Sequence, residues 1–112
     1  MNWTIESAFA DEAIERVEAS EDGYFFWLKG IPVQIQIKLS ANSVRGGYNF
    51  QLSHYIQTPR QAGPHYPART WDYERGDALH LAVIAITQDY KEAVLADLVP
   101  HAEWLVPNTF GI

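Results

Sequence analysis

Apolar and polar residues alternate along the middle of the chain, in two segments that span residues 33–39 and 48–57. In the first segment the apolar positions are Val33, Ile35, Ile37 and Leu39, and the polar positions are Gln34, Gln36 and Lys38. Alternation with a period of two is typical of a strand that buries one face. An aromatic, β-prone run, Tyr24–Leu28, precedes both segments. Three short strands with short connections predict an antiparallel meander.

The segment from Thr4 to about Ala19 has apolar residues at every fourth position, which predicts an amphipathic helix. These apolar positions are Ile5, Phe9, Ala13 and Val17. Thr4 is a suitable N-cap, because its side chain can accept a hydrogen bond from the first turn. An alternative interpretation ends the helix early and makes Arg16–Ser20 a strand, which pairs with the aromatic run through a turn at Glu21–Gly23.

On the longer helix, three acidic residues would share one face. Asp11, Glu15 and Glu18 would fall within about 60° of one another, on the side away from the apolar positions. Asp11 and Glu15 are like charges four residues apart, which costs roughly a few tenths of a kcal/mol. A local cost without evident compensation can mark a functional surface. We therefore expect these acids to be exposed and unpaired, and to contact a partner.

A second helix is predicted from Asp77, as its N-cap, to about Leu98, with Pro100 ending it. Its main apolar face consists of Leu79, Ala82, Val83, Ile86, Tyr90, Ala93 and Val94. A second apolar side is formed by Leu81, Ile84 and Leu95. A second copy of the chain would cover this second side in a closed homodimer.

The order of these elements predicts an α+β fold. We expect an antiparallel sheet of three to four strands, with the N-terminal helix and the long C-terminal helix packed mainly on one face. The segment 58–69 is expected to be a loop, and Trp71–Tyr73 a short edge strand. Because the chain has 112 residues and 47% of them are apolar, residues 1–112 are expected to form a single domain. The expected core positions are Val33, Ile35, Ile37, Phe50, Leu52 and Ile56 of the sheet, which meet Phe9, Val83, Ile86 and Tyr90 of the helices.

The charges form three blocks, which sum to the net charge of −6. Residues 1–22 carry seven acidic residues and one basic residue, Arg16. Residues 23–71 carry five basic residues and no acidic one, and residues 72–112 carry seven acidic and two basic residues. Charge asymmetry of this kind bears on partners rather than on the fold. Two explanations of the acidic first block remain open: neutralisation within the fold by Arg45, Arg60 or Arg69, or neutralisation by a basic partner.

Motifs for nucleophilic catalysis, nucleotide binding and zinc chemistry are absent from the sequence. The chain has no cysteine, and no two of its histidines have the helical spacing of metal ligands. We therefore expect no catalytic residue, no cofactor and no metal. The nearest polar constellation is Asp72–His80, in which Asp77 and His80 share a helical turn. With the loop around His65, it supports an alternative function, a small-molecule enzyme or ligand-binding protein.

The acid-free block combines basic and aromatic residues, which is the composition of some single-strand nucleic-acid binders. Most of those aromatic residues alternate in phase with Leu52 and Ile56, and so belong to the core face. Spread cations in a protein of net charge −6 make a poor phosphate groove, so we expect no nucleic-acid partner. The opposite, neutral face suits a protein partner, and its candidate residues are Gln34, Gln36, Gln51 and Tyr55.

These features favour a small acidic binding protein, rather than an enzyme, that contacts a protein with a basic surface. Its candidate partner-binding residues are Asp11, Glu15, Glu18, Gln34, Gln36, Gln51 and Tyr55. In size, acidity and lack of motifs the chain is similar to small inhibitor proteins of phages and mobile elements, such as anti-CRISPR and toxin-immunity proteins. That profile implies an inhibitor of a nucleic-acid-handling complex or of a toxin. The first residues do not resemble a signal peptide, and no apolar run approaches ~20 residues, so we expect a cytoplasmic protein without membrane contact.

Overall fold

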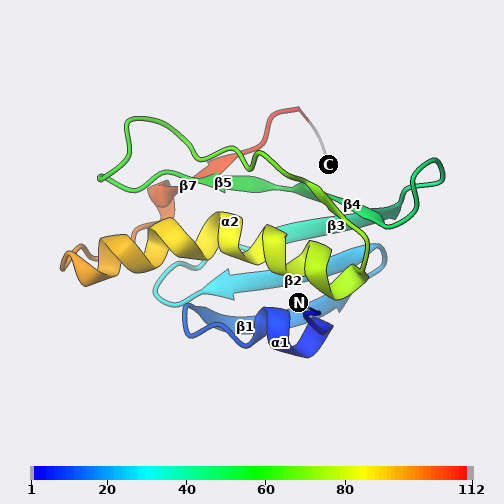
Figure 1. The fold of residues 1–112 in the computed structure, drawn as a ribbon. Coiled ribbons are helices and arrows are strands. Elements are labelled where there is room, and N and C mark those ends of the chain that lie inside the picture. The colour runs from blue at the N-terminus through cyan, green and yellow to red at the C-terminus, as the bar shows by residue number, and fades with distance from the viewer. Residues whose placement is uncertain (1, 111–112) are drawn as a thin grey trace.

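A computed structural model describes residues 2–110 and has the α+β fold that the sequence predicts (Figure 1). The helices are α1 (Ile5–Phe9), α2 (Arg75–Leu95) and the short 3-10 helix η1 (Ala102–Trp104). The strands are β1 (Ile14–Ser20), β2 (Gly23–Leu28), β3 (Ile35–Ala41), β4 (Tyr48–Leu52), β5 (His54–Ile56), β6 (Trp71–Asp72) and β7 (Leu105–Pro107). Across residues 2–110 no helix is long and apolar enough to cross a membrane.

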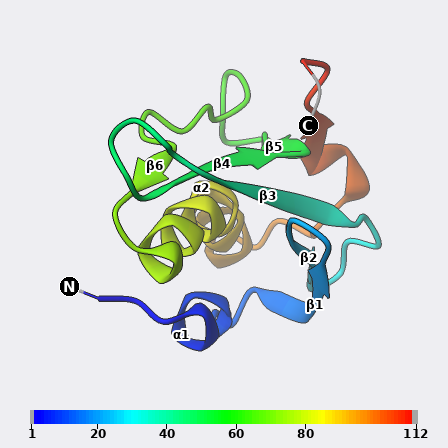
Figure 2. The ribbon, with the colours of Figure 1, turned by 90° about the vertical axis from the view of Figure 1, so that its right-hand side faces the viewer.

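The antiparallel sheet has five strands, more than the three to four predicted, and their order β1-β2-β3-β4-β6 confirms the meander. The strands β5 and β7 form a separate antiparallel pair. In Figure 2, α2 lies against one face of the large sheet, with β3 and β4 above it and β2 to one side. The helix α1 packs against α2, close to β1. The strand β1 is therefore at one edge of the sheet and the short β6 at the other.

The core lies between α2 and the strands. Its buried strand positions are Ile35, Ile37, Phe50, Leu52 and Ile56, and α2 contributes Leu79, Ala82, Val83, Ile86, Tyr90 and Ala93. Val33 and Phe9 are partly buried against this cluster. Val94, which was predicted to belong to the main apolar face of the long helix, is 41% exposed. Gln34 and Gln51 are exposed, so the predicted register of the strands is confirmed.

The first helix is much shorter than the helix predicted to Ala19, and the alternative interpretation is correct. Thr4 caps α1 as predicted, but α1 has only five residues and β1 follows it. The reason begins at Asp11, whose side chain accepts the N–H of Ala13 and whose carbonyl accepts the N–H of Ile14. This turn stops the helical pattern. Pairing with the aromatic β2 then favours a strand over a helix.

The long helix α2 starts before the predicted position. Its N-cap is Glu74, which makes no side-chain cap, so the prediction that Asp77 caps the helix is wrong. Asp77 instead accepts the backbone N–H of Trp3 at 2.7 Å. The backbone of Trp3 also passes very close to Gly76, since a Cβ at Gly76 would lie 1.8 Å from the Trp3 carbonyl oxygen. Gly76 thus lets the N-terminal segment pack against the start of α2.

The long helix also ends before the predicted position. Asp97 has a left-handed φ of 63°, and its N–H bonds to the carbonyl of Val94. The N–H of Leu98 bonds to the carbonyl of Ala93, which completes a Schellman motif. This motif, rather than Pro100, ends the helix.

The strand predicted over residues 48–57 is interrupted at Ser53. The Ser53 hydroxyl accepts the N–H of Gln36 at 2.8 Å and also bonds to Nδ1 of His54 at 2.7 Å. Beyond this point β5 leaves β3 and pairs with β7, a strand that the sequence did not predict. The C-terminal segment therefore adds a strand to the fold and buries Trp104.

Candidate functional site

The edge strand β1 is largely exposed. It pairs with β2 on one side, and Figures 1 and 2 show no strand along its other side. Five of its seven residues, 15–19, are exposed. Because an edge strand offers unpaired backbone groups, it can accept a further strand from another chain.

The two-residue turn between β1 and β2 determines which backbone groups of β1 are free. Ser20 and Gly23 close this turn as directly opposite partners. In a two-residue hairpin the closing pair and every second pair after it are hydrogen-bonded. The residues of β1 that bond to β2 are therefore Ser20, Glu18 and Arg16. The N–H and C=O groups of Val17 and Ala19 lie in the plane of the sheet and point away from β2, toward the open side of β1. No turn or loop of residues 2–110 bonds to them.

The acidic residues of the first block divide into structural and free ones. Glu18 is exposed as predicted, but the prediction that it is unpaired is wrong, because its carboxylate lies 3.2 Å from Nε of Arg16. Glu15 is exposed and is the extra residue of a β-bulge. Asp11 contradicts the prediction, because its side chain is only 12% exposed and its Oδ2 lies 3.0 Å from Nζ of Lys91 on α2. Asp11 therefore helps to hold the fold, and Glu15 and Glu18 remain candidate partner contacts.

Asp11 is held as a carboxylate. Burial acts to raise its pKa, but the N–H of Ala13 and the ammonium of Lys91 outweigh burial and lower the pKa below 3.8. No such neutralisation reaches Glu12, Glu15 and Glu21, which have no cation within 4.0 Å among residues 2–110. Glu15 belongs to β1, and Glu12 and Glu21 lie just before and just after it along the chain.

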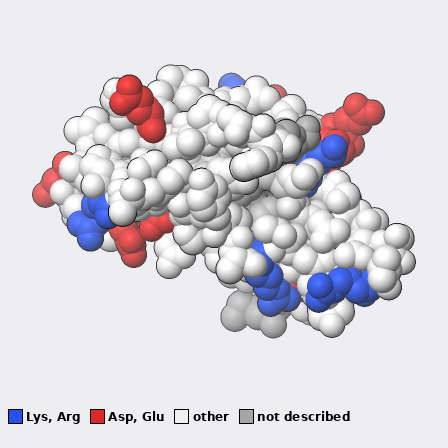
Figure 3. Space-filling view, turned by 90° about the horizontal axis from the view of Figure 1, so that it is seen from above, with Lys and Arg blue, Asp and Glu red and all other residues white. Residues whose placement is uncertain are grey.

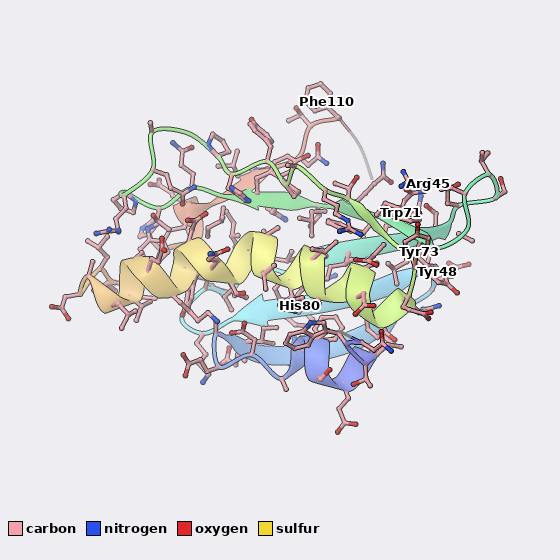
Figure 4. The ribbon with its side chains drawn as sticks, viewed as in Figure 1. Arg45, Tyr48, Trp71, Tyr73, His80 and Phe110 are labelled. Atoms are coloured by element: carbon pink, nitrogen blue, oxygen red, sulfur yellow. The ribbon has the colours of Figure 1, made fainter. Side chains whose placement is uncertain are left out.

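The basic middle block does little to neutralise the acidic first block. Arg45 and Arg69 lie over the indole of Trp71, at 3.7 and 5.9 Å from its centroid. Figure 4 shows Arg45 beside Trp71 at the end of the sheet. Within the described chain Arg60 forms no ion pair, and only Lys38 of this block approaches the first block, at 3.9 Å from Asp22. The explanation that Arg45, Arg60 or Arg69 hold the acids is therefore wrong.

A shallow apolar hollow of about 260 Å³ lies beside β1. Its apolar lining comes from Ile5, Phe9 and Ala10 of α1, Val17 and Ala19 of β1, and Tyr24 of β2. Val17 is 40% exposed at this hollow. Because alternate side chains of a strand point to the same face, a strand added to β1 would place every second side chain over the hollow.

The neutral face of β3 and β4 points away from α2, as predicted. Gln51 lies opposite Lys38, and Gln36 lies beside Ser53. Gln34 is exposed just before β3. Figure 3 looks onto the side of the molecule that carries β4 and β5, where the charged residues lie mainly at the margins.

Tyr55 packs edge-on against Tyr66 at a centroid distance of 4.8 Å. Both rings line a hollow of about 280 Å³ together with Gln51 and Phe110. The structure thus brings Gln51 and Tyr55 together. It does not bring them to the acidic edge, because β2 and β3 separate β1 from β4.

The alternative candidate cluster forms one polar hollow of about 320 Å³, lined by Asp72, Asp77 and His80. The N-terminal segment engages it: the indole of Trp3 stacks on His80 with a centroid distance of 3.6 Å, and the Trp3 N–H binds Asp77. Burial lowers the pKa of His80 below 6.5, although nearby carboxylates oppose this shift. His65 does not line this hollow. Among the described residues no three His, Cys, Asp or Glu side chains are placed so that they could hold a metal ion together.

A groove of about 780 Å³ follows the C-terminal half of α2. It is lined by Ile84, Val94 and Leu95 among others, and Leu95 is 85% exposed. Leu81 lies elsewhere, at the hollow beside Trp3. The predicted second apolar side of the helix is therefore divided between two hollows.

Sequence reasoning missed two features of the site, Lys91 as the partner of Asp11 and the free backbone of Val17 and Ala19. Lys91 lies 80 residues from Asp11, and no local pattern connects them. The free edge could have been predicted from the Glu21–Gly23 turn, because the alternative interpretation used this turn to pair a strand at Arg16–Ser20 with the aromatic run.

Comparisons with known proteins give no relative. No family model, no curated protein and no solved structure matches the chain.

Proposed function

We propose that this protein is a binding module that uses β1 to contact a basic surface on another protein. The proposal rests on the edge of β1, which is exposed and acidic and whose Val17 and Ala19 backbone groups have no partner among residues 2–110. Basic surfaces are common where proteins hold nucleic acid. An inhibitor that covers the basic surface of a nucleic-acid-handling complex, or of a toxin, is the role that fits this arrangement.

Charge supports this proposal. Glu12, Glu15 and Glu21 flank the edge without a cation within 4.0 Å in the described chain. Glu18 is paired, but only with the exposed Arg16, and such surface pairs contribute about 0–1 kcal/mol. The field of these acids would accelerate association with a basic partner, and added salt would screen it.

The neutral face is a second contact area for a large partner. Gln34, Gln36 and Gln51 are available there, and Tyr55 is held against Tyr66. A partner that reaches both areas must extend across β2 and β3. The acidic edge is therefore the primary surface, and the neutral face adds contacts only to a broad interface.

The alternative function, a ligand binder or enzyme at Asp72, Asp77 and His80, has less support. The Trp3 indole covers the His80 ring, and the backbone N–H of Trp3 donates a hydrogen bond to Asp77. His80 and Asp77 therefore both have a structural role. A ligand that co-purifies with the protein and displaces Trp3, seen as a change in its fluorescence, would favour this alternative.

The experiment compares wild-type protein with the Glu15→Lys/Glu18→Lys variant. Each is immobilised and exposed to lysate from cells that encode it, and retained proteins are quantified by mass spectrometry at low and high salt. Wild type should retain a basic protein in stoichiometric amount and release it at high salt, because the contact is electrostatic. The double variant should retain little of that protein.

The matched control is Glu74→Lys/Glu103→Lys, which makes the same charge change at two exposed positions, one just before α2 and one in η1. It should retain the partner as wild type does. Equal loss of the partner in both variants would mean that the net charge of the protein, rather than the β1 edge, determines retention. Equal retention in both would contradict a role for the β1 edge.

A further inference from the structure

We infer that β1 binds by strand addition, and that the partner supplies an extended segment in which basic and apolar side chains alternate. This inference rests on the proposed function and specifies the chemistry of the partner at the same edge. Each requirement placed on the partner comes from a different part of β1: its backbone, its two faces and its charge.

The backbone requires an extended partner. Val17 and Ala19 each present an N–H and a C=O that point away from β2, at the spacing of a further antiparallel or parallel strand. The bulge at Glu15 limits regular pairing to the part of β1 that follows it. A helix or a flat surface cannot satisfy these groups in a row. An extended segment can.

The inner face requires apolar side chains. Val17 and Ala19 face the hollow of about 260 Å³ that α1 completes with Ile5 and Phe9. A strand beside β1 would project every second side chain over this hollow. Medium-sized apolar residues such as valine would cover the exposed part of Val17 and remove it from water.

The outer face and the ends require cations. Glu18 is exposed on the outer face, and its partner Arg16 also stacks on Trp27 at 3.9 Å. The stacking on Trp27 keeps Arg16 in place even without Glu18, so the Glu18 carboxylate is available to a second cation. Glu12 and Glu21 lie beyond the two ends of β1 and have no cation within 4.0 Å in the described chain. A lysine at every second position of the partner would meet this charge.

Charge also argues against a second copy of this chain as the occupant. Pairing β1 with its own copy would bring two acidic first blocks together, in a protein of net charge −6. Charged residues and bulges on edge strands are the devices that prevent self-pairing. The same residues that repel a second copy attract a basic strand, so the edge is selective for an oppositely charged partner.

The experiment uses a synthetic peptide of about seven residues that alternates lysine and valine, with blocked ends, which is long enough to span the part of β1 that follows the bulge at Glu15. Calorimetry measures its affinity for the full chain, and a peptide that alternates glutamate and valine is the charge control. The Ala19→Pro variant removes one outward N–H and leaves the bonds to β2 intact, because Ala19 does not bond to β2. The Ala19→Val variant keeps the N–H and is the matched control.

The lysine–valine peptide should bind wild type and Ala19→Val, and should bind Ala19→Pro at least about tenfold more weakly. The glutamate–valine peptide should not bind. Melting curves verify that Ala19→Pro is folded. If it is not, amide hydrogen exchange on wild type replaces it, and the peptide should slow exchange at Val17 and Ala19 by at least about tenfold.

Other outcomes overturn the inference. If Glu15→Lys/Glu18→Lys weakens peptide binding but Ala19→Pro does not, strand addition is wrong and the proposed electrostatic contact stands. If the peptide does not bind wild type, or if neither variant weakens its binding, strand addition at β1 is wrong. The proposed function fails as well only if, in the lysate experiment, Glu15→Lys/Glu18→Lys retains the partner as wild type does. If wild type self-associates and Ala19→Pro makes it monomeric, a second copy is the occupant and the basic strand is wrong.

Discussion

Nζ of Lys91 lies 3.0 Å from Oδ2 of Asp11, so α2 holds the turn that precedes β1. Asp11 also accepts the N–H of Ala13, which begins the departure from helical structure. One acid of the first block therefore organises the edge strand, and the acids that follow it along the chain are left exposed. The distinction between structural and free acids is the basis of the predictions on charge.

Replacing Asp11 by asparagine should destabilise the protein by about 1–2 kcal/mol at neutral pH, since a charge-assisted hydrogen bond is lost. Because the folded pKa of Asp11 is below its ordinary value of 3.8, its contribution is complete above pH 3.8 and is lost as pH falls through the folded pKa. Melting curves across pH measure this. A difference between wild type and variant that grows toward low pH would contradict the account.

Replacing His80 by phenylalanine should reduce the loss of stability at mildly acidic pH. Burial lowers the folded pKa of His80 below 6.5, so the unfolded chain binds the proton more readily and wild type loses stability as pH falls through 6.5. Phenylalanine keeps a ring stacked on Trp3 and cannot be protonated. Denaturant unfolding at pH 8 and pH 5 gives the comparison. An unchanged pH dependence would mean that other groups, such as the half-buried His54, cause it.

Replacing Tyr90 by phenylalanine should cost about 1–2 kcal/mol. The buried Tyr90 hydroxyl donates to the Lys29 carbonyl at 2.5 Å and joins α2 to the end of β2. The variant leaves that carbonyl without its donor. Tyr73→Phe is the control, because Tyr73 is 68% exposed and its loss of a hydroxyl should change stability by less than about 0.5 kcal/mol. Equal melting temperatures for the two variants would contradict a structural role for this bond.

The groove along α2 gives a separate prediction of self-association. If the apolar side that includes Ile84 and Leu95 is a homodimer interface, light scattering at high micromolar concentration should show a dimer. Leu95→Glu should then give a monomer without lowering the melting temperature, because Leu95 is 85% exposed. A wild-type monomer at that concentration would remove the prediction.

The sequence was most informative where a local pattern decides the structure. Val33–Leu39 alternates with a period of two because one face of β3 is buried, so its strand and its register could both be predicted. The segment after α1 was predicted wrongly, since Ala13 and Val17 fit a helical period as well. Its strand depends on pairing with β2. Likewise the neutralisation of Asp11 comes from Lys91, 80 residues away, and no local signal indicates it.

The most direct test of the central claim, that the acidic edge of β1 exists for a basic partner, is the salt dependence of lysine–valine peptide binding. Calorimetry at ionic strengths from about 0.05 M to about 0.5 M compares wild type with Glu15→Lys/Glu18→Lys. We predict that wild-type affinity falls steeply with salt, and that the folded variant binds weakly at every salt concentration. Wild-type affinity that does not change with salt, or that the variant retains, would contradict the claim.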